Sequence, residues 1–143
     1  MRRLLAFITA IALPFVASAQ PPQFLQVNPQ SSNPFSPVVR VGNMLYLAGT
    51  LGTKDNKLVP GGIAAETRQA MQNIRETLDK AGSDMEHVVK CTVFLADMKE
   101  WAAMNEVYRT FFQAGKFPAR SAFGATGLAL DARTEIECIA VVR

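Results

Sequence analysis

The chain has 143 residues, enough for one domain of ordinary size and too few for two. Hydrophobic residues make up 49%, charged residues 19%, and the net charge is +3, a balance that excludes a disordered tail, a collagen-like repeat and a coiled coil. Two cysteines cannot build a disulfide scaffold or an all-cysteine zinc site, and the single histidine, His87, excludes most histidine-based metal and triad chemistry. We therefore expect chemistry based on carboxylates, arginine, hydroxyls and backbone groups, with no metal and no cofactor.

Residues 1–19 have the three-part pattern of a secretory signal peptide. Two arginines follow Met1, an uncharged apolar run extends over 4–16, and Ala17-Ser18-Ala19 provides the small residues that a signal peptidase reads. A membrane anchor needs about 20 apolar residues, and this run is shorter and contains Pro14. We expect cleavage after Ala19, a periplasmic or secreted protein, and no stable membrane association.

The mature chain would be close to neutral, because removal of the signal peptide leaves 13 basic and 12 acidic residues. A nucleic-acid binder typically carries a cluster of Lys and Arg with interleaved aromatic residues. No such cluster remains after residue 19, so we expect no nucleic-acid partner.

Residues 20–37 contain many prolines and polar residues, which predicts an extended lead-in before a single domain over 38–143. The elements expected in this domain are, in chain order, strands 38–41 and 44–48 around a tight Gly42-Asn43 turn, a helix over 63–81 ended by Gly82, a strand over 88–95, a second helix over about 98–112, and strands near 119–124 and 134–142. The order β-β-α-β-α-β-β predicts an α/β two-layer sandwich, with two helices on one face of a mixed sheet.

Helical spacing in 63–81 places one apolar stripe toward the sheet and most charged residues, Glu66 among them, away from it. The strands, however, are apolar on both faces: Leu45 and Leu47 oppose Tyr46 in one strand, and Val88 and Phe94 lie opposite the main apolar face of another. Two helices can cover only one sheet face, and a large exposed apolar face is unusual for a monomer. We therefore expect a homo-oligomer, with sites possible in the clefts between subunits.

Phe117-Pro118-Ala119-Arg120-Ser121 is the most informative stretch for chemistry. Arg120 should share a strand face with Ala122, and its planar fork suits a carboxylate held by two hydrogen bonds. From the residues alone, a surface or intramolecular ion pair is the competing interpretation.

The last strand places Glu135 and Glu137 on one face, opposite Ile136 and Cys138. Such a pair can serve solubility at a sheet edge, or it can supply an ion-pair partner and a general acid/base. Asn105 lies one turn before Tyr108 and can either cross-link its helix to a loop or face a substrate.

Three other features have simple interpretations. His87 is expected at the surface. Cys91 and Cys138 fall on apolar strand faces, where thiols are usually inert, and pairing them would require neighbouring strands. Gly49, Gly52 and Gly61-Gly62 lack the spacing of a phosphate loop and are interpreted as turns.

From about Asn28 to the C-terminus, the motifs follow one another as in the RidA/YjgF family, which the chain resembles in order and without a large insertion. The matching motifs are Asn33-Pro34-Phe35-Ser36, Arg40-Val41-Gly42-Asn43, Leu47-Ala48-Gly49, Thr67-Arg68-Gln69-Ala70, Asn73-Ile74, Ala81-Gly82-Ser83, the segment 88–98, Asn105-Glu106-Val107-Tyr108 with Phe111-Phe112, Phe117-Pro118-Ala119-Arg120-Ser121 and the segment 135–140.

This resemblance implies a chorismate-mutase-like α/β fold and a homotrimer with clefts between subunits. It also implies hydrolysis of reactive imines and enamines, of the 2-aminoacrylate and 2-iminobutanoate type, to 2-oxo acids and ammonia. Arg120 would grip the substrate carboxylate, Glu135 would orient water and carry protons, and Asn105 would lie at the cleft. The backbone around Gly49 and at Ser121 and Ala122 would frame the imine.

Three positions depart from the family pattern: its cleft tyrosine is Phe35, its serine before the glycine is Ala48, and its frequent cysteine after Arg-Ser is Ala122. Each removes a polar group, which favours bulkier, less polar imines. A non-catalytic trimer that binds a small carboxylate in the same clefts remains the alternative function. RNA cleavage, also known in relatives, fits poorly with a neutral chain and one histidine.

Overall fold

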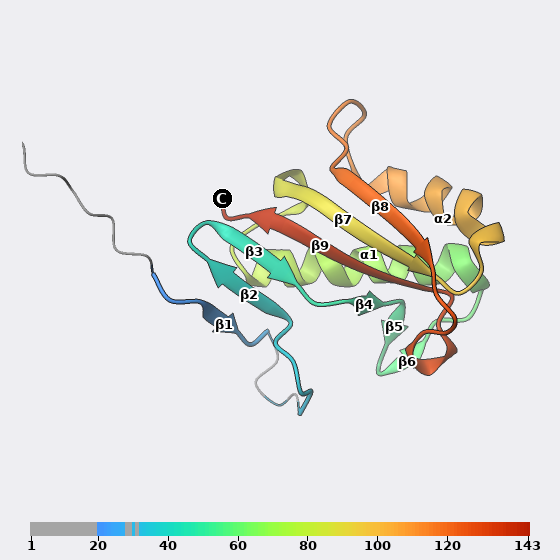
Figure 1. The fold of residues 1–143 in the computed structure, drawn as a ribbon, viewed down its shortest axis with the longest axis horizontal. Helices are drawn as coiled ribbons and strands as arrows, with labels where there is room; N and C mark the ends of the chain where they lie inside the picture. Colours follow the sequence, from blue (N-terminus) through green and yellow to red (C-terminus); the bar gives the residue numbers. More distant parts are fainter. Residues whose placement is uncertain (1–19, 28–29, 31) are drawn as a thin grey trace, which may run out of the picture.

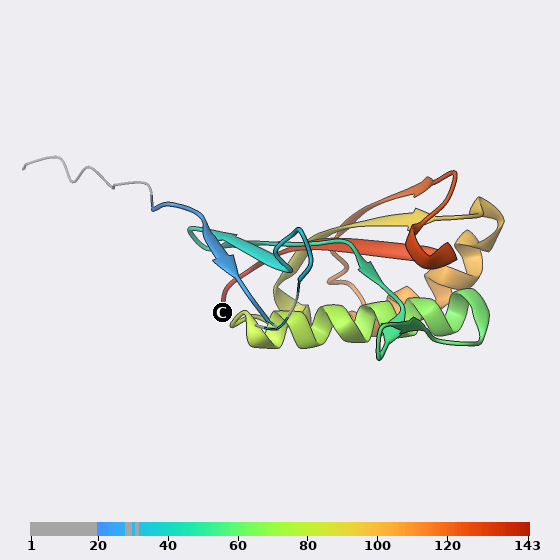
Figure 2. The same ribbon diagram turned by 90° about the horizontal axis from the view of Figure 1, so that it is seen from below.

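The chain folds into one mixed sheet with two helices on one of its faces (Figures 1 and 2). This computed structural model describes residues 20–27, 30 and 32–143, so the expected signal peptide lies outside the described residues. The arrangement confirms the predicted α/β two-layer sandwich.

The main sheet contains seven strands in the order β1-β2-β3-β9-β7-β8, with the short β4 pairing with β9 beyond β3. Only β7 and β8 are parallel, whereas all other neighbours are antiparallel. The strands are β1 (Gln23–Leu25), β2 (Val38–Val41), β3 (Met44–Leu47), β4 (Thr50–Leu51), β7 (Val88–Leu95), β8 (Ala119–Gly124) and β9 (Thr134–Val141); β5 (Thr53–Lys54) and β6 (Lys57–Leu58) form a separate hairpin.

The strands predicted from residue 38 onward are all present in the sheet, as β2, β3, β7, β8 and β9. Gly42 adopts a left-handed φ of 57° in the expected turn between β2 and β3. The lead-in differs from prediction, because β1 pairs with β2 and so extends the sheet. The short strands β4 to β6 also escaped prediction, since two-residue strands are too short to show an alternating pattern.

The first helix, α1 (Gly62–Lys80), buries the predicted stripe against the sheet, and Gly82 beyond its end has the expected left-handed φ of 78°. The placement of Glu66 away from that stripe was wrong: its side chain is only 5% exposed. One carboxylate oxygen accepts a hydrogen bond of 2.7 Å from the backbone N–H of Arg133. Glu66 thus ties α1 to the loop that leads into β9.

The second helix, α2 (Trp101–Tyr108), is extended at both ends by single 3-10 turns, η2 (Met98–Glu100) and η3 (Arg109–Phe111). Further 3-10 turns occur at η1 (Met85–His87) and η4 (Ala129–Asp131). The described part of the chain contains no helix that combines the length and apolarity needed to cross a bilayer.

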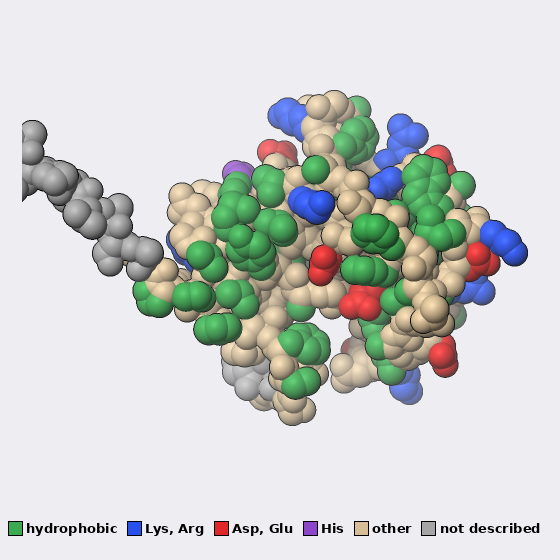
Figure 3. Space-filling view, viewed as in Figure 1, with side chains coloured by type: hydrophobic (Ala, Val, Ile, Leu, Met, Phe, Trp, Pro, Cys, Tyr) green, Lys and Arg blue, Asp and Glu red, His purple; other side chains and the backbone are tan. Residues whose placement is uncertain are grey.

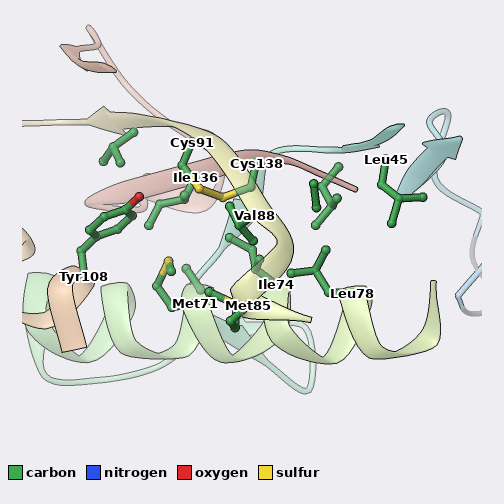
Figure 4. Packing of buried hydrophobic residues seen from close by; sticks show 14 of the residues in the cluster. Leu45, Met71, Ile74, Leu78, Met85, Val88, Cys91, Tyr108, Ile136 and Cys138 are labelled. Carbon is green, nitrogen blue, oxygen red and sulfur yellow. A yellow bond between two sulfur atoms is a disulfide. The ribbon is translucent and has the colours of Figure 1, made fainter. Parts of the chain in front are cut away.

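A disulfide joins β7 to β9 inside the core (Figure 4). Cys91 and Cys138 are paired across the two strands, their Cα atoms are 4.1 Å apart, and both side chains are buried. The interpretation of these residues as inert free thiols was therefore wrong. Sequence spacing did not reveal that β7 and β9, which are 47 residues apart at this pair, become neighbours.

The face of the sheet opposite the helices is open, and apolar side chains gather on it in patches with charged side chains between them (Figure 3). In β3, Leu45 and Leu47 are buried on the helix side, whereas Tyr46 between them is 45% exposed. Phe123 of β8 is 54% exposed and contacts Phe94 of β7, with ring centroids 6.4 Å apart. The structure thus confirms that the strands carry apolar side chains on both faces and that the helices cover only one. The placement of Val88 on the open face was wrong: an irregularity in the register between Val88 and Lys90 turns Val88 into the core and leaves Val89 44% exposed.

Candidate functional site

A cavity of about 260 Å³ lies between α2 and the segment that leads into β8. Its lining comes from α2 and η3 on one side and from the β8 segment on the other: Asn105, Tyr108, Arg109, Phe117, Pro118 and Arg120. Two of these side chains are guanidinium groups, and none is acidic. The cavity therefore has the electrostatic character of an anion-binding site.

Arg120 projects from β8 toward the helix side of the sheet. In the sheet register it lies beside Cys91, which in turn pairs with Cys138, and both cysteines face the core. The guanidinium carbon lies 4.7 Å from the ring centroid of Tyr108 and 5.7 Å from that of Trp101. Within the described residues Arg120 forms no ion pair, so the structure does not contain the intramolecular pair that competed with anion binding.

Asn105 lies on the same stripe of α2 as the two rings, four residues after Trp101 and three before Tyr108. It is half-buried and lines the cavity next to Arg120. Its side chain forms no hydrogen bond to another described residue, so it does not cross-link the helix to a loop in this chain. The structure thus brings Arg120 and Asn105 together at this cavity.

Glu135 lies on the opposite, open face of the sheet. In the register it pairs with Phe94, whose other neighbour is the exposed Phe123, whereas Ile136 next to it points into the core. Its carboxylate is half-buried over Gly49, where a Cβ atom would overlap with the Glu135 side chain. The lack of a side chain at Gly49 therefore makes room for this carboxylate, which corrects the interpretation of Gly49 as a simple turn residue.

A second correction of this kind concerns Gly52. A Cβ atom there would overlap with the backbone of Glu66, so this glycine permits close packing of the chain after β4 on α1. Of the four glycines interpreted as turns, Gly61 and Gly62 have the expected left-handed conformation, with φ values of 115° and 72°.

The structure also places the other predicted site residues, which are Ala48, Phe35, Ser121 and Ala122. Ala48 precedes Gly49, and its N–H donates a 3.0 Å hydrogen bond to the carbonyl of Pro37, which brings the segment with the exposed Phe35 beside it. Ser121 lies in register with Thr92 and Glu137 on the open face. Ala122 lies in register with Val93 and packs against the core.

The predicted site residues thus lie in two separate groups, which we name the arginine half-site and the glutamate half-site. The arginine half-site consists of Arg120 and Asn105 in the cavity beside α2. The glutamate half-site consists of Glu135, Gly49 and Ala48 at the junction of β3, β4 and β9, with Phe35 nearby. The sequence did not show that Arg120 and Glu135 point to opposite faces of the sheet.

Sequence reasoning missed Trp101, Tyr108 and Arg109 as parts of the arginine half-site. The available signal was the spacing of seven residues between two aromatic residues on either side of Asn105. Burial raises the pKa of Tyr108 to about 12, although the nearby charge of Arg120 opposes this shift. Tyr108 is therefore a neutral phenol at physiological pH.

His87 contacts Asp84 and not the residues of either half-site. Its ring nitrogen lies 2.7 Å from a carboxylate oxygen of Asp84, and its side chain is 36% exposed. The hydrogen bond with His87 lowers the pKa of Asp84. This agrees with the expectation of a surface histidine.

The chain is similar to proteins of one family. The family described as Endoribonuclease L-PSP matches residues 25–142. A mouse protein named 2-iminobutanoate/2-iminopropanoate deaminase is 44% identical over 115 residues, covering 79% of this chain and 84% of the mouse protein.

Solved structures of related proteins also resemble this chain. Yeast Mmf1 is 36% identical with a TM-score of 0.75, covering 79% of this chain and 90% of its own. RidA from the Antarctic bacterium Psychrobacter sp. PAMC 21119 is 31% identical with a TM-score of 0.77, covering 84% and 99%. The likeness extends from the first strand to the last, and the chain therefore belongs to the RidA/YjgF family, described as Endoribonuclease L-PSP.

Proposed function

We propose that this protein hydrolyses reactive 2-imino acids and their enamines to 2-oxo acids and ammonia, as a 2-iminobutanoate/2-iminopropanoate deaminase-like hydrolase. The observation that carries the proposal is the cavity beside α2, which Arg120 and Arg109 both line and to which no acidic residue contributes. A 2-imino acid carries a carboxylate next to its reactive carbon, so an arginine fork can anchor it. The curated mouse relative, 44% identical, is named for this reaction.

The proposed chemistry needs an anchor, a placed water and one proton carrier. Arg120 holds the substrate carboxylate, and Asn105 contacts the bound molecule from α2. The Glu135 carboxylate takes a proton from water as the water oxygen attacks the carbon of the protonated imine, giving a neutral carbinolamine. Glu135 then gives this proton to the nitrogen and takes the hydroxyl proton as the C–N bond breaks, which forms the carbonyl of the 2-oxo acid and releases ammonia. An enamine enters the same sequence after protonation on carbon, with the protonated Glu135 carboxyl as the donor, which gives the protonated imine.

We further propose that the site forms between subunits of a homotrimer. Arg120 and Glu135 lie on opposite faces of one sheet, so one chain offers each half-site without its complement. A ring of three identical subunits can bring the arginine half-site of one copy to the glutamate half-site of the next. The open apolar face supports the same assembly, because Tyr46 and Phe123 are large exposed apolar side chains on it.

The departures from the family pattern bear on substrate choice. Phe35 and Ala48 adjoin the glutamate half-site, and Ala122 follows Arg120 by two residues. None of these side chains can hydrogen-bond, so we propose that the pocket accepts bulkier, less polar imines than a pocket with tyrosine, serine and cysteine.

The test is imine hydrolysis by residues 20–143, compared with the Arg120→Ala variant. An amino-acid oxidase would generate imines from several amino acids, and semicarbazide would compete for them. We expect faster release of 2-oxo acid with the wild type. Loss of a desolvated carboxylate partner costs about 2–4 kcal/mol, so Arg120→Ala should lower kcat/KM by about 30- to 1,000-fold.

Equal rates with and without folded wild-type protein, for every imine, would contradict the deaminase proposal. Retained binding of 2-oxobutanoate in that case would favour the non-catalytic carboxylate-binding trimer. The same preparations would be assayed for RNA cleavage, the activity in the family's description. Cleavage that persists in Arg120→Ala would point to a different site.

Export to an oxidising compartment is also proposed. The sequence pattern of residues 1–19 supports it, and so does the buried Cys91–Cys138 disulfide, because structural disulfides persist mainly outside the reducing cytosol. N-terminal sequencing of the protein made in a bacterial host with a secretion pathway should begin at Gln20. An intact Met1 on protein from the cytosolic fraction would contradict export.

A further inference from the structure

We propose that Trp101 and Tyr108 are positioning residues that hold the Arg120 guanidinium for carboxylate binding. The inference deepens the proposed function and rests on it for the identity of the anion. Both rings project from one stripe of α2 at a spacing of seven residues, and both lie within cation–π distance of the same guanidinium carbon, at 5.7 and 4.7 Å.

The rings take the place of the ion-pair partner that an arginine at this depth usually has. Arg120 is half-buried and makes no ion pair within the described residues, so a free side chain of this length would sample many rotamers. An aromatic face attracts the cation without neutralising it or occupying its N–H donors. The in-plane donors of the guanidinium therefore stay available for a carboxylate, which a bound Asp or Glu would block.

Tyr108 is itself held rigidly. It is only 3% exposed, its ring contacts that of Phe112 at 5.0 Å between centroids, and it rises from α2 toward the sheet and the disulfide (Figure 4). Trp101, at the start of α2, is 40% exposed. One fixed ring and one accessible ring thus contact Arg120 from the two ends of the helix.

The aromatic face of Tyr108, not its hydroxyl, is the functional group in this arrangement. The hydroxyl oxygen is buried and has no hydrogen-bond partner among the described residues. A pKa near 12 also keeps it protonated, so it cannot serve as an anionic partner for Arg120. Phenylalanine should therefore replace Tyr108 in the positioning role, whereas leucine, with similar apolarity but no π face, should not.

The first experiment compares Tyr108→Phe with Tyr108→Leu in steady-state hydrolysis of 2-iminobutanoate. With Tyr108→Leu we expect KM to rise about tenfold with a smaller change in kcat, since anchorage of the carboxylate is what weakens. Tyr108→Phe should keep KM within about twofold of wild type. Urea unfolding of each variant checks that the fold is intact, and Trp101→Leu, at an exposed position, gives the same KM test should Tyr108→Leu fail to fold.

A second readout does not depend on catalysis. Trp101 is the only tryptophan in the chain, so its fluorescence reports on the group beside it. Replacing Arg120 with Leu should shift the emission, and Tyr108→Leu should shift it in the same direction because the guanidinium is released, whereas Tyr108→Phe should not. An inactive wild type that shows this pattern would refute the deaminase and keep the positioning role.

Two results would overturn the inference itself. One is a Tyr108→Phe variant as impaired in KM as Tyr108→Leu, with both folded, because the hydroxyl would then be the group that matters. The other is a folded Tyr108→Leu variant with wild-type KM and wild-type Trp101 emission, because Arg120 would then be held by other means.

Discussion

Arg120→Ala and Glu135→Ala subunits, each inactive when assembled alone, are expected to regain about one quarter of wild-type activity when refolded together in equal amounts. The expectation follows from the two half-sites, whose residues point to opposite faces of one sheet. In a ring, a site is intact wherever a subunit with native Arg120 faces one with native Glu135, and random assembly makes this combination at about one interface in four.

The matched control mixes Arg120→Ala subunits with subunits that carry both substitutions. No interface in these mixed rings has a native arginine, so activity should stay at the level of the single variant. Both mixtures would be checked for equal size by light scattering. If the first mixture were as inactive as the control, Arg120 and Glu135 would have to act within the same chain, and the proposed site between subunits would be wrong.

The fold was largely predictable because local chemistry and tertiary packing agree along most of the chain. The Gly42-Asn43 turn, the apolar stripe of α1 and the alternation in β9 each allow one local structure, and the structure confirms all three. The same alternation correctly placed Glu135 on the face opposite Ile136.

What escaped prediction depends on which segments meet in space. Glu66 is buried because the backbone N–H of Arg133, 67 residues away, provides a hydrogen bond that no local pattern contains. The position of Gly49 matters because β4 and β9 bring it under Glu135. Strand order likewise determines whether Cys91 meets Cys138, and a sequence gives strand faces far more directly than strand order.

The same distinction between local pattern and spatial arrangement applies to the candidate site. Arg120, Glu135 and Asn105 could be named from the sequence because residue type and motif identify them. That one chain separates Arg120 from Glu135 follows from the register of β8, β7 and β9, which the structure supplies. The aromatic contacts to Arg120 required the packing of α2 against β8.

Loss of the Cys91–Cys138 disulfide is expected to lower the free energy of unfolding by about 4 kcal/mol, given the sequence separation of 47 between the cysteines. The bond restricts the unfolded chain, because it closes a loop that contains α2, β8 and the first half of β9. In the native sheet the two cysteines are already paired neighbours, so the bond requires little rearrangement of the folded state. The midpoint of urea unfolding should fall by about 2 M in the reduced protein.

The comparison uses protein refolded with and without dithiothreitol, which differ only in the bond itself. The double variant Cys91→Ala/Cys138→Ala is the control, since its midpoint should not respond to the reductant. Thiol labelling of the native reduced protein should be slow, because Cys91 and Cys138 are 1% and 2% exposed.

Equal urea midpoints for oxidised and reduced protein would show that the bond adds nothing to stability. A lower midpoint has a consequence for the site, because Asn105, Arg120 and Glu135 all lie within the closed loop. Reduction would then weaken the segment that carries these three residues, while α1 and the β2–β3 hairpin lie outside it. Stability and the proposed activity should therefore respond together to the redox state of the compartment in which this protein folds.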